Sequence, residues 1–239
     1  MDPLAQGGVA SLLAGLATGL GGLPVLLGRA VPHRVLDAVL GFAAGVMFAV
    51  SGGALLIESD LGNPSVIGAT LIGGVAVLAL RALASVEHAS GGARLGRGVR
   101  VALVVTLHNV VEGMAVVATF GDYGGRAGVG VALAIAAHNV PEGVAVAEPL
   151  RRAGVRPWRC AALALLSGLG EPLGAILALT VLGPVLPSGT ASALAAGAMV
   201  VLASTELLPE AFSHAYVAEA AAGLLVGVVA ALALVAAPW

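Results

Sequence analysis

The segment AGVGVALAIAAHNVPEGVAVAE, residues 127–148, combines a membrane-spanning composition with a polar centre. Most of its side chains are Ala, Val, Leu or Ile, and about 20 predominantly apolar residues suffice for a helix to cross the hydrocarbon core. His138, Asn139 and Glu142 nevertheless lie in its second half. The segment lacks the alternation of a membrane-barrel strand. It therefore predicts a transmembrane α-helix that carries ionisable groups inside the bilayer.

The rest of the chain has the same apolar character. Of its 239 residues, 59% are hydrophobic and only 10% are charged, whereas soluble domains have about 25% charged residues. So few charges cannot solvate the surface of a soluble fold, which excludes that class. Disorder is excluded too, because disordered segments are poor in apolar residues. A net charge of −2 argues against a nucleic-acid partner. The single cysteine, Cys160, excludes a disulfide framework or a thiolate metal cage. We expect an integral membrane protein.

Charges and Gly/Pro clusters divide the chain into eight predicted helices, which we expect to form one all-α transmembrane domain over residues 1–239. The predicted helices lie near residues 4–28, 35–57, 64–84, 99–120, 127–148, 158–182, 189–208 and 217–237. All arginines except Arg126 fall in the connections between helices one and two, three and four, and five and six. Cytoplasmic loops attract Arg and Lys. We therefore expect these connections in the cytoplasm and both termini outside it.

Parts of the chain repeat in helices that run in opposite directions. The matching pairs are residues 43–47 with 195–199, 55–58 with 207–210, and 71–80 with 225–234. Helix two is expected to run outward and helix seven inward, so the repeat is inverted. Secondary transporters use such repeats to place the substrate site near the midplane of the bilayer. The alternative explanation is shared low complexity in Ala, Gly and Leu.

The polar centre occurs twice, as His-Asn-Val-Val-Glu-Gly at 108–113 and His-Asn-Val-Pro-Glu-Gly at 138–143. Each ionisable group within a membrane costs about 2.5–3.5 kcal/mol on insertion scales. In both copies His and Glu are four residues apart, on one helical face. Two such faces together suit Zn²⁺ and other first-row divalent cations, although buried salt bridges without metal are an alternative. A neighbouring, oxygen-rich set consists of Asn109, Asn139, Glu112 and Glu142.

Two prolines add backbone acceptors at the same depth. Pro141 removes a donor and frees the carbonyl of Ala137, and Pro172 does the same for Gly168. Inside lipid, such a carbonyl must be satisfied within the protein or by cavity water. Because Pro172 directly follows Glu171, a third helix is expected to bring a carboxylate and a backbone break to the polar centre.

The doubled motif, together with Gly168-Leu169-Gly170-Glu171-Pro172-Leu173-Gly174-Ala175, resembles the bacterial members of the ZIP (Zrt/Irt-like protein) metal transporters. The resemblance implies a 3+2+3 inverted-repeat bundle of eight helices that carries divalent metal into the cytoplasm and is not an enzyme. It also implies a binuclear metal centre between helices four, five and six. One site would use His108, Glu112, His138 and Glu142, and the other Asn109, Asn139 and Glu171 with Glu112 and Glu142 shared.

The resemblance further implies the bacterial inner (plasma) membrane as location. Zn²⁺ is the expected cargo, with Cd²⁺, Fe²⁺ or Mn²⁺ as further candidates, and no cofactor is expected. The other expected partners are the lipid bilayer and a second copy of the chain in a homodimer. Two positions depart from the family pattern, since Val111 stands where many bacterial members have Pro and Asn139 where some have Asp.

Further polar residues lie toward the two ends of the expected bundle. Candidates to receive the ion at the inner end are Glu206, Glu210, His214, Glu87 and His88. Candidates for an outer entrance are Glu58 and Asp60. A solvated polar loop explains the inner group equally well.

Two other classes of function compete with transport. An intramembrane metal-dependent hydrolase could use the same His and Glu ligands with a metal-bound water. The sequence offers no spare general base or nucleophile and no His-Glu-x-x-His motif. A purely structural membrane protein would leave the buried carboxylates unexplained. Metal accumulation in proteoliposomes without chemical change of a substrate would distinguish transport from hydrolysis.

Overall fold

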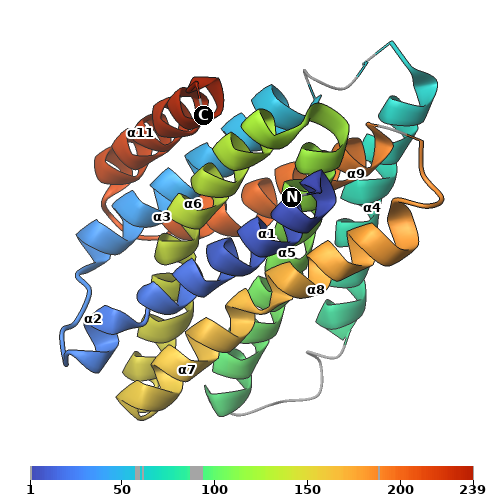
Figure 1. Cartoon of the computed structure of the whole chain (residues 1–239). Helices are drawn as coiled ribbons and strands as arrows, with labels where there is room; N and C mark the ends of the chain where they lie inside the picture. The colour runs from blue at the N-terminus through green and yellow to red at the C-terminus, as the bar shows by residue number, and fades with distance from the viewer. Residues whose placement is uncertain (1, 57–59, 61, 87–93, 188, 239) are drawn as a thin grey trace.

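A computed structural model describes residues 2–56, 60, 62–86, 94–187 and 189–238, and these residues form helices and connecting turns without a strand (Figure 1). Three segments, η1, η3 and η4, are π-helical. The elements are α1 (Pro3–Leu20), α2 (Leu23–Leu26), α3 (His33–Ala49), η1 (Val50–Leu56), α4 (Pro64–Val86), α5 (Arg94–Tyr123), α6 (Gly125–Arg152), α7 (Pro157–Gly168), α8 (Gly170–Leu177), η3 (Ala178–Leu182), α9 (Thr190–Leu202), η4 (Ala203–Leu207), α10 (Leu208–Ala211) and α11 (Val217–Ala236).

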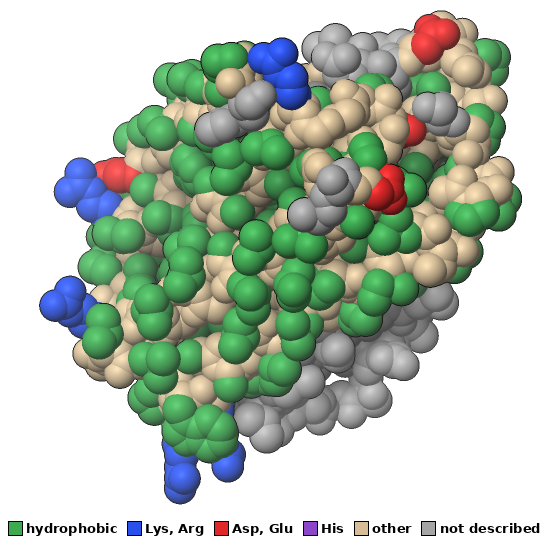
Figure 2. All heavy atoms as spheres, viewed as in Figure 1, with side chains coloured by type: hydrophobic (Ala, Val, Ile, Leu, Met, Phe, Trp, Pro, Cys, Tyr) green, Lys and Arg blue, Asp and Glu red, His purple; other side chains and the backbone are tan. Residues whose placement is uncertain are grey.

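Seven stretches of the described chain are helical, long and apolar enough to cross a membrane. They correspond to all the predicted helices except the fourth. The fourth is α5, a helix of 30 residues that packs along α1, α6, α8 and α9. Figure 2 shows apolar side chains spread across the face that it draws, as expected where lipid replaces water. The chain is a multi-pass, all-helical membrane protein.

The boundaries differ from the predicted ones where packing decides them. The first predicted helix is divided, because α1 ends at Leu20 and α2 begins at Leu23. A Cβ at Gly21 would collide with the backbone of Val140 and Val144, so only glycine allows this close approach of the turn to α6. The sixth predicted helix is interrupted at Leu169, whereas α6 continues through Pro141.

Glycines bring the helices around the polar centre into backbone contact. A Cβ at Gly113 of α5 would fall on the carbonyl of Glu171 in α8, and one at Gly143 of α6 would fall on the carbonyl of Thr18 in α1. Similar approaches join α3 to α11 and α4 to α9. The described helices thus form one closely packed group of α1, α5, α6, α7 and α8 beside two closely packed pairs.

Candidate metal centre

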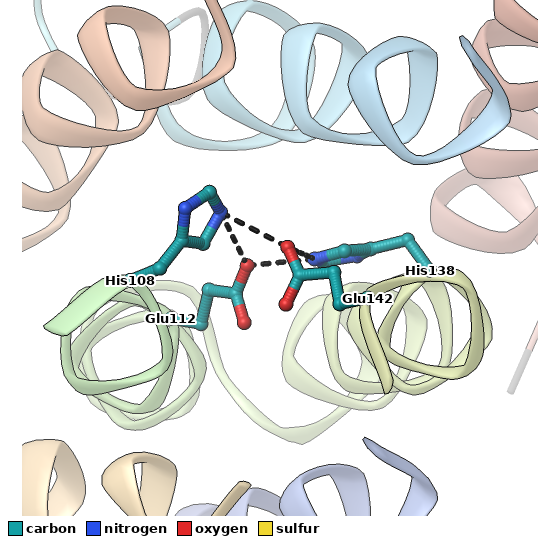
Figure 3. Close-up of side chains that lie close together, drawn as sticks. All are labelled: His108, Glu112, His138 and Glu142. Carbon is teal, nitrogen blue, oxygen red and sulfur yellow. Dashed lines mark hydrogen bonds and ion pairs between the residues drawn. The ribbon is translucent and has the colours of Figure 1, made fainter. Parts of the chain in front are cut away.

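Four ionisable side chains meet between α5 and α6 (Figure 3). His108 and Glu112 project from α5, and His138 and Glu142 from α6, in each case one helical turn apart. All four are at most 2% exposed. One ligand atom from each lies within 4.8 Å of all the others. The structure therefore brings together the four residues predicted for one metal site, and their binding of a metal stays a prediction.

The distances between these groups suit a common cation. Oε1 of Glu112 lies 2.6 Å from Nε2 of His138 and 3.2 Å from Nε2 of His108. Oε1 of Glu142 lies 3.1 Å from Nε2 of His108 and 3.7 Å from Nε2 of His138. A tetrahedral site with bonds of about 2.1 Å separates its ligand atoms by about 3.4 Å. The four atoms can therefore surround one Zn²⁺-sized ion after small adjustments.

A methionine lies against the same cluster. Sδ of Met47, a fully buried residue of α3, is 2.9 Å from Nε2 of His108. Thioether sulfur is a soft ligand that favours softer metals. In the sequence, Met47 stands out only as part of the internal repeat, because an apolar side chain in an apolar helix gives no indication of a polar site.

The asparagines use their amide nitrogens within the protein. Nδ2 of Asn109 donates to the carbonyl of Ser167 at 2.9 Å. Nδ2 of Asn139 donates to the carbonyl of Ala14 at 2.8 Å and also to Oε1 of Glu171. With their nitrogens fixed in this way, the amide oxygens remain as acceptors.

Buried acceptor oxygens collect beside the four-residue cluster. Five of them have no hydrogen-bond donor among the described residues: Oδ1 of Asn109, Oδ1 of Asn139, Oε2 of Glu112, Oε2 of Glu142 and Oε2 of Glu171. A buried polar atom without a partner costs about 1–3 kcal/mol. Acceptors without donors are satisfied by a cation, and oxygen ligands of this kind suit divalent metals.

The predicted inner residues have separate partners. Glu206 pairs with Arg81 of α4. Glu210 is exposed. His214 instead bonds through Nδ1 to Oδ1 of Asp37 at 2.8 Å. The structure therefore does not gather these three residues into one site.

Of the remaining predicted residues, the structure describes only Asp60. Asp60 is exposed, and its Oδ1 accepts a hydrogen bond from the backbone N–H of Gly62 at 3.0 Å, which is a local turn contact. Glu58, Glu87 and His88 lie outside the described residues.

Comparison with known proteins gives a consistent family match. Residues 85–235 match the sequence model of a family described as "ZIP Zinc transporter". Zinc transporter GufA of Myxococcus xanthus is 38% identical over 97% of this chain and 98% of its own length. Zinc transporter ZIPB of Bordetella bronchiseptica is 35% identical over 88% of this chain and 74% of its own length. Zinc transporter ZupT of Corynebacterium glutamicum is 37% identical over 91% of this chain and 93% of its own length.

Proposed function

The chain belongs to the ZIP family of transporters, not to a family of enzymes, and from this premise we propose that it carries Zn²⁺ into the cytoplasm across the bacterial inner membrane. The observation that carries the proposal is the buried cluster of His108, Glu112, His138 and Glu142 inside a membrane bundle. A transporter needs its ligands at such depth to replace the hydration shell of the ion.

The cargo is bound at a binuclear centre in this proposal. Glu112 and Glu142 each direct Oε1 toward the imidazoles, while Oε2 of each is a buried acceptor without a donor. A carboxylate with this arrangement can bridge two ions. One ion takes the imidazoles, and the other takes the oxygen-rich side formed by Asn109, Asn139 and Glu171. Cd²⁺, Fe²⁺ and Mn²⁺ are further candidate cargoes, since nitrogen, oxygen and sulfur ligands are all present.

An inverted repeat is supported by contacts that occur in matching pairs. A Cβ at Gly45 would meet the carbonyl of Leu224, and one at Gly197 would meet the carbonyl of Thr70. Gly45 corresponds to Gly197 in the sequence repeat, and extending the match of residues 71–80 with 225–234 by one residue pairs Thr70 with Leu224. The π-helical segments η1 and η4 also fall at corresponding positions.

We propose that transport moves the group of α1, α5, α6, α7 and α8 against the remaining helices. Within the first group, and within the pairs α3–α11 and α4–α9, glycines bring backbones into close contact. The site crosses the boundary, because Met47 of α3 touches His108 of α5. The Arg-rich end faces the cytoplasm in this proposal, and both termini face outward.

The exit path begins at Glu206 of η4, a carboxylate that pairs with Arg81 of α4. Arg81 holds this carboxylate until the ion arrives. Roles for Glu210, Glu87 and His88 in exit, and for Glu58 and Asp60 in entrance, stay predictions. So do a single domain over residues 1–239 and a homodimer.

Uptake by proteoliposomes containing the purified protein tests the proposal. Radioactive Zn²⁺ should accumulate inside, and unlabelled Cd²⁺, Fe²⁺ and Mn²⁺ should compete according to their affinity. Glu219→Gln is the matched control for substitutions of the central carboxylates and should leave uptake unchanged, because Glu219 is a carboxylate at the surface, paired with Arg34. Zn²⁺ accumulation no greater than in protein-free liposomes, for protein that is folded, would contradict the proposal.

A further inference from the structure

A second group of metal-ligand side chains lies at the end of the bundle where α3 begins and α10 turns into α11. His33 and Asp37 are four residues apart on α3, which is the spacing of His and Glu in the central cluster. Nδ1 of His214 bonds to Oδ1 of Asp37 at 2.8 Å. The rings of His33 and His214 have their centroids 4.0 Å apart and are inclined by 41°. Two imidazoles and a carboxylate therefore meet outside the central site.

The Asp37 carboxylate prepares His214 to bind a metal. Asp37 is fully buried, and its Oδ1 accepts the hydrogen bond of the His214 ring. A histidine that donates Nδ1–H to a carboxylate presents Nε2 as a lone-pair nitrogen, the arrangement found behind many metal-ligating histidines. The His214 side chain is 30% exposed, so a solvated ion can reach it.

Two buried polar atoms of this group have no partner within the part of the chain that the structure describes. Nδ1 of His33 and Oδ2 of Asp37 are buried and have no hydrogen-bond partner among the described residues. A structural His–Asp pair accounts for Asp37 and His214, but it does not account for a second imidazole packed against the first.

We infer that His33 and His214, with Asp37 behind them, form a second site for a divalent transition-metal cation such as Zn²⁺, separate from the central cluster. The imidazoles supply the nitrogen ligands. Asp37 orients His214 and offsets the charge of the ion, and water completes the coordination on the exposed side.

A cationic side chain occupies part of this site. The guanidinium of Arg152, at the end of α6, contacts Nε2 of His33 and donates to the carbonyl of Val31 at 3.0 Å. Arg152 also pairs with the buried Glu148. Among the described residues, the His214 ring has one other polar contact, from Nδ1 to Oγ of Ser213 at 3.1 Å. Metal binding therefore displaces Arg152 from His33 and loosens a contact between α6 and the start of α3.

Zn²⁺ stoichiometry of the purified full chain in detergent tests this site. The triple variant His108→Gln, Glu112→Gln and His138→Gln removes both imidazoles and one of the two shared carboxylates of the central site, and we expect it to retain one Zn²⁺ per chain. Adding His33→Gln or His214→Gln should abolish that binding, and adding Asp37→Asn should weaken it by about 10–100-fold. Adding Arg152→Gln should strengthen it by about tenfold, because a competing cation is removed.

Glu219→Gln serves as the control, because it removes a carboxylate at the same end of the bundle without touching the three residues. If the triple variant does not fold, the same comparison uses the unaltered chain, where His33→Gln with His214→Gln should lower the stoichiometry by one Zn²⁺. The inference is overturned if the retained ion survives both histidine substitutions, or if no Zn²⁺ binds beyond the central ions. Uptake activity does not enter this test, so its outcome is independent of the proposed transport.

Discussion

Sδ of Met47 lies 2.9 Å from Nε2 of His108, so a thioether from α3 meets an imidazole from α5 at the candidate metal centre. The contact joins the two parts of the bundle that we propose to move against each other. It also adds a soft ligand to a set otherwise made of nitrogen and oxygen atoms. Loss of this contact should therefore affect which metals are preferred and how the two parts meet.

Met47→Leu should lower the preference for Cd²⁺ and Zn²⁺ over Mn²⁺, because it removes the sulfur while nearly conserving volume. Such a replacement costs less than about 1.5 kcal/mol of stability. Met199→Leu is the matched control, since Met199 is equally buried and occupies the corresponding position of the repeat. Competition among the three ions in proteoliposome uptake measures the effect. Equal selectivity in both variants would exclude Met47 as a ligand.

Glu142→Ala should abolish transport, whereas Asn109→Ala should only reduce it. Glu142 belongs to both proposed ion sites, so its loss removes a ligand from each and leaves the positive charge poorly balanced. Asn109 belongs to one site alone. Bound Zn²⁺ per chain and uptake, measured on folded variants, distinguish the two cases. Two bound ions and normal uptake in Glu142→Ala would rule out shared ligation.

The close approach of α5 to α8 predicts opposite effects for two glycine substitutions. Gly113→Ala places a Cβ on the carbonyl of Glu171, so we expect a loss of about 1–3 kcal/mol in stability. Gly8→Ala in α1 meets nothing within 4 Å, so we expect no loss and up to about 1 kcal/mol of gain from helix propensity. Thermal unfolding in detergent measures both. A stable Gly113→Ala variant would contradict the rigid packing of α5 on α8.

Features that depend on neighbouring residues in the sequence could be predicted, and features that depend on distant residues could not. Helices could be predicted from apolar runs bounded by Arg, Gly and Pro, because insertion in a membrane depends on composition. The central cluster could be predicted because His108 and Glu112 share a face within one helix, and the motif then repeats. The division of the first predicted helix after Leu20 could not be predicted, because it depends on the contact of Gly21 with α6.

Contacts between residues far apart in the sequence explain most of the other differences between prediction and structure. Asp37 and His214 are 177 residues apart, and no local pattern connects them. Glu206 and His214 are close in sequence, which predicts a shared site, yet the partner of Glu206 is Arg81, across the bundle. Proline positions also do not predict by themselves where a helix breaks. Helix α6 continues through Pro141, whereas the sixth predicted helix is interrupted at Leu169, shortly before Pro172.

Arginine placement predicts the orientation of the bundle. In a Cys160→Ser background, a cysteine at the exposed position Arg156 should react with a membrane-impermeant reagent only from the cytoplasmic side. A cysteine at the exposed position Asp60, before α4, should react only from the opposite side. Labelling of intact cells and of inverted vesicles compares the two. Labelling of Arg156→Cys in intact cells would reverse the proposed direction of transport.

Metal binding at the central site should release protons. Imidazole binds metal only when its ligating nitrogen is unprotonated, and histidine in peptides has a pKa of about 6.5. Lower pH therefore favours the protonated, metal-free form, and affinity should fall as pH decreases from 8 to 5. With His108 and His138 both as ligands, the dependence should approach about a hundredfold in affinity per pH unit at the acidic end.

Because the second site would also release protons, the measurement uses His214→Gln. Calorimetric titration with Zn²⁺ in buffers of different ionisation enthalpy gives the number of protons released per ion. Ligation by these two imidazoles would be untenable if affinity stayed constant across this range and no protons were released.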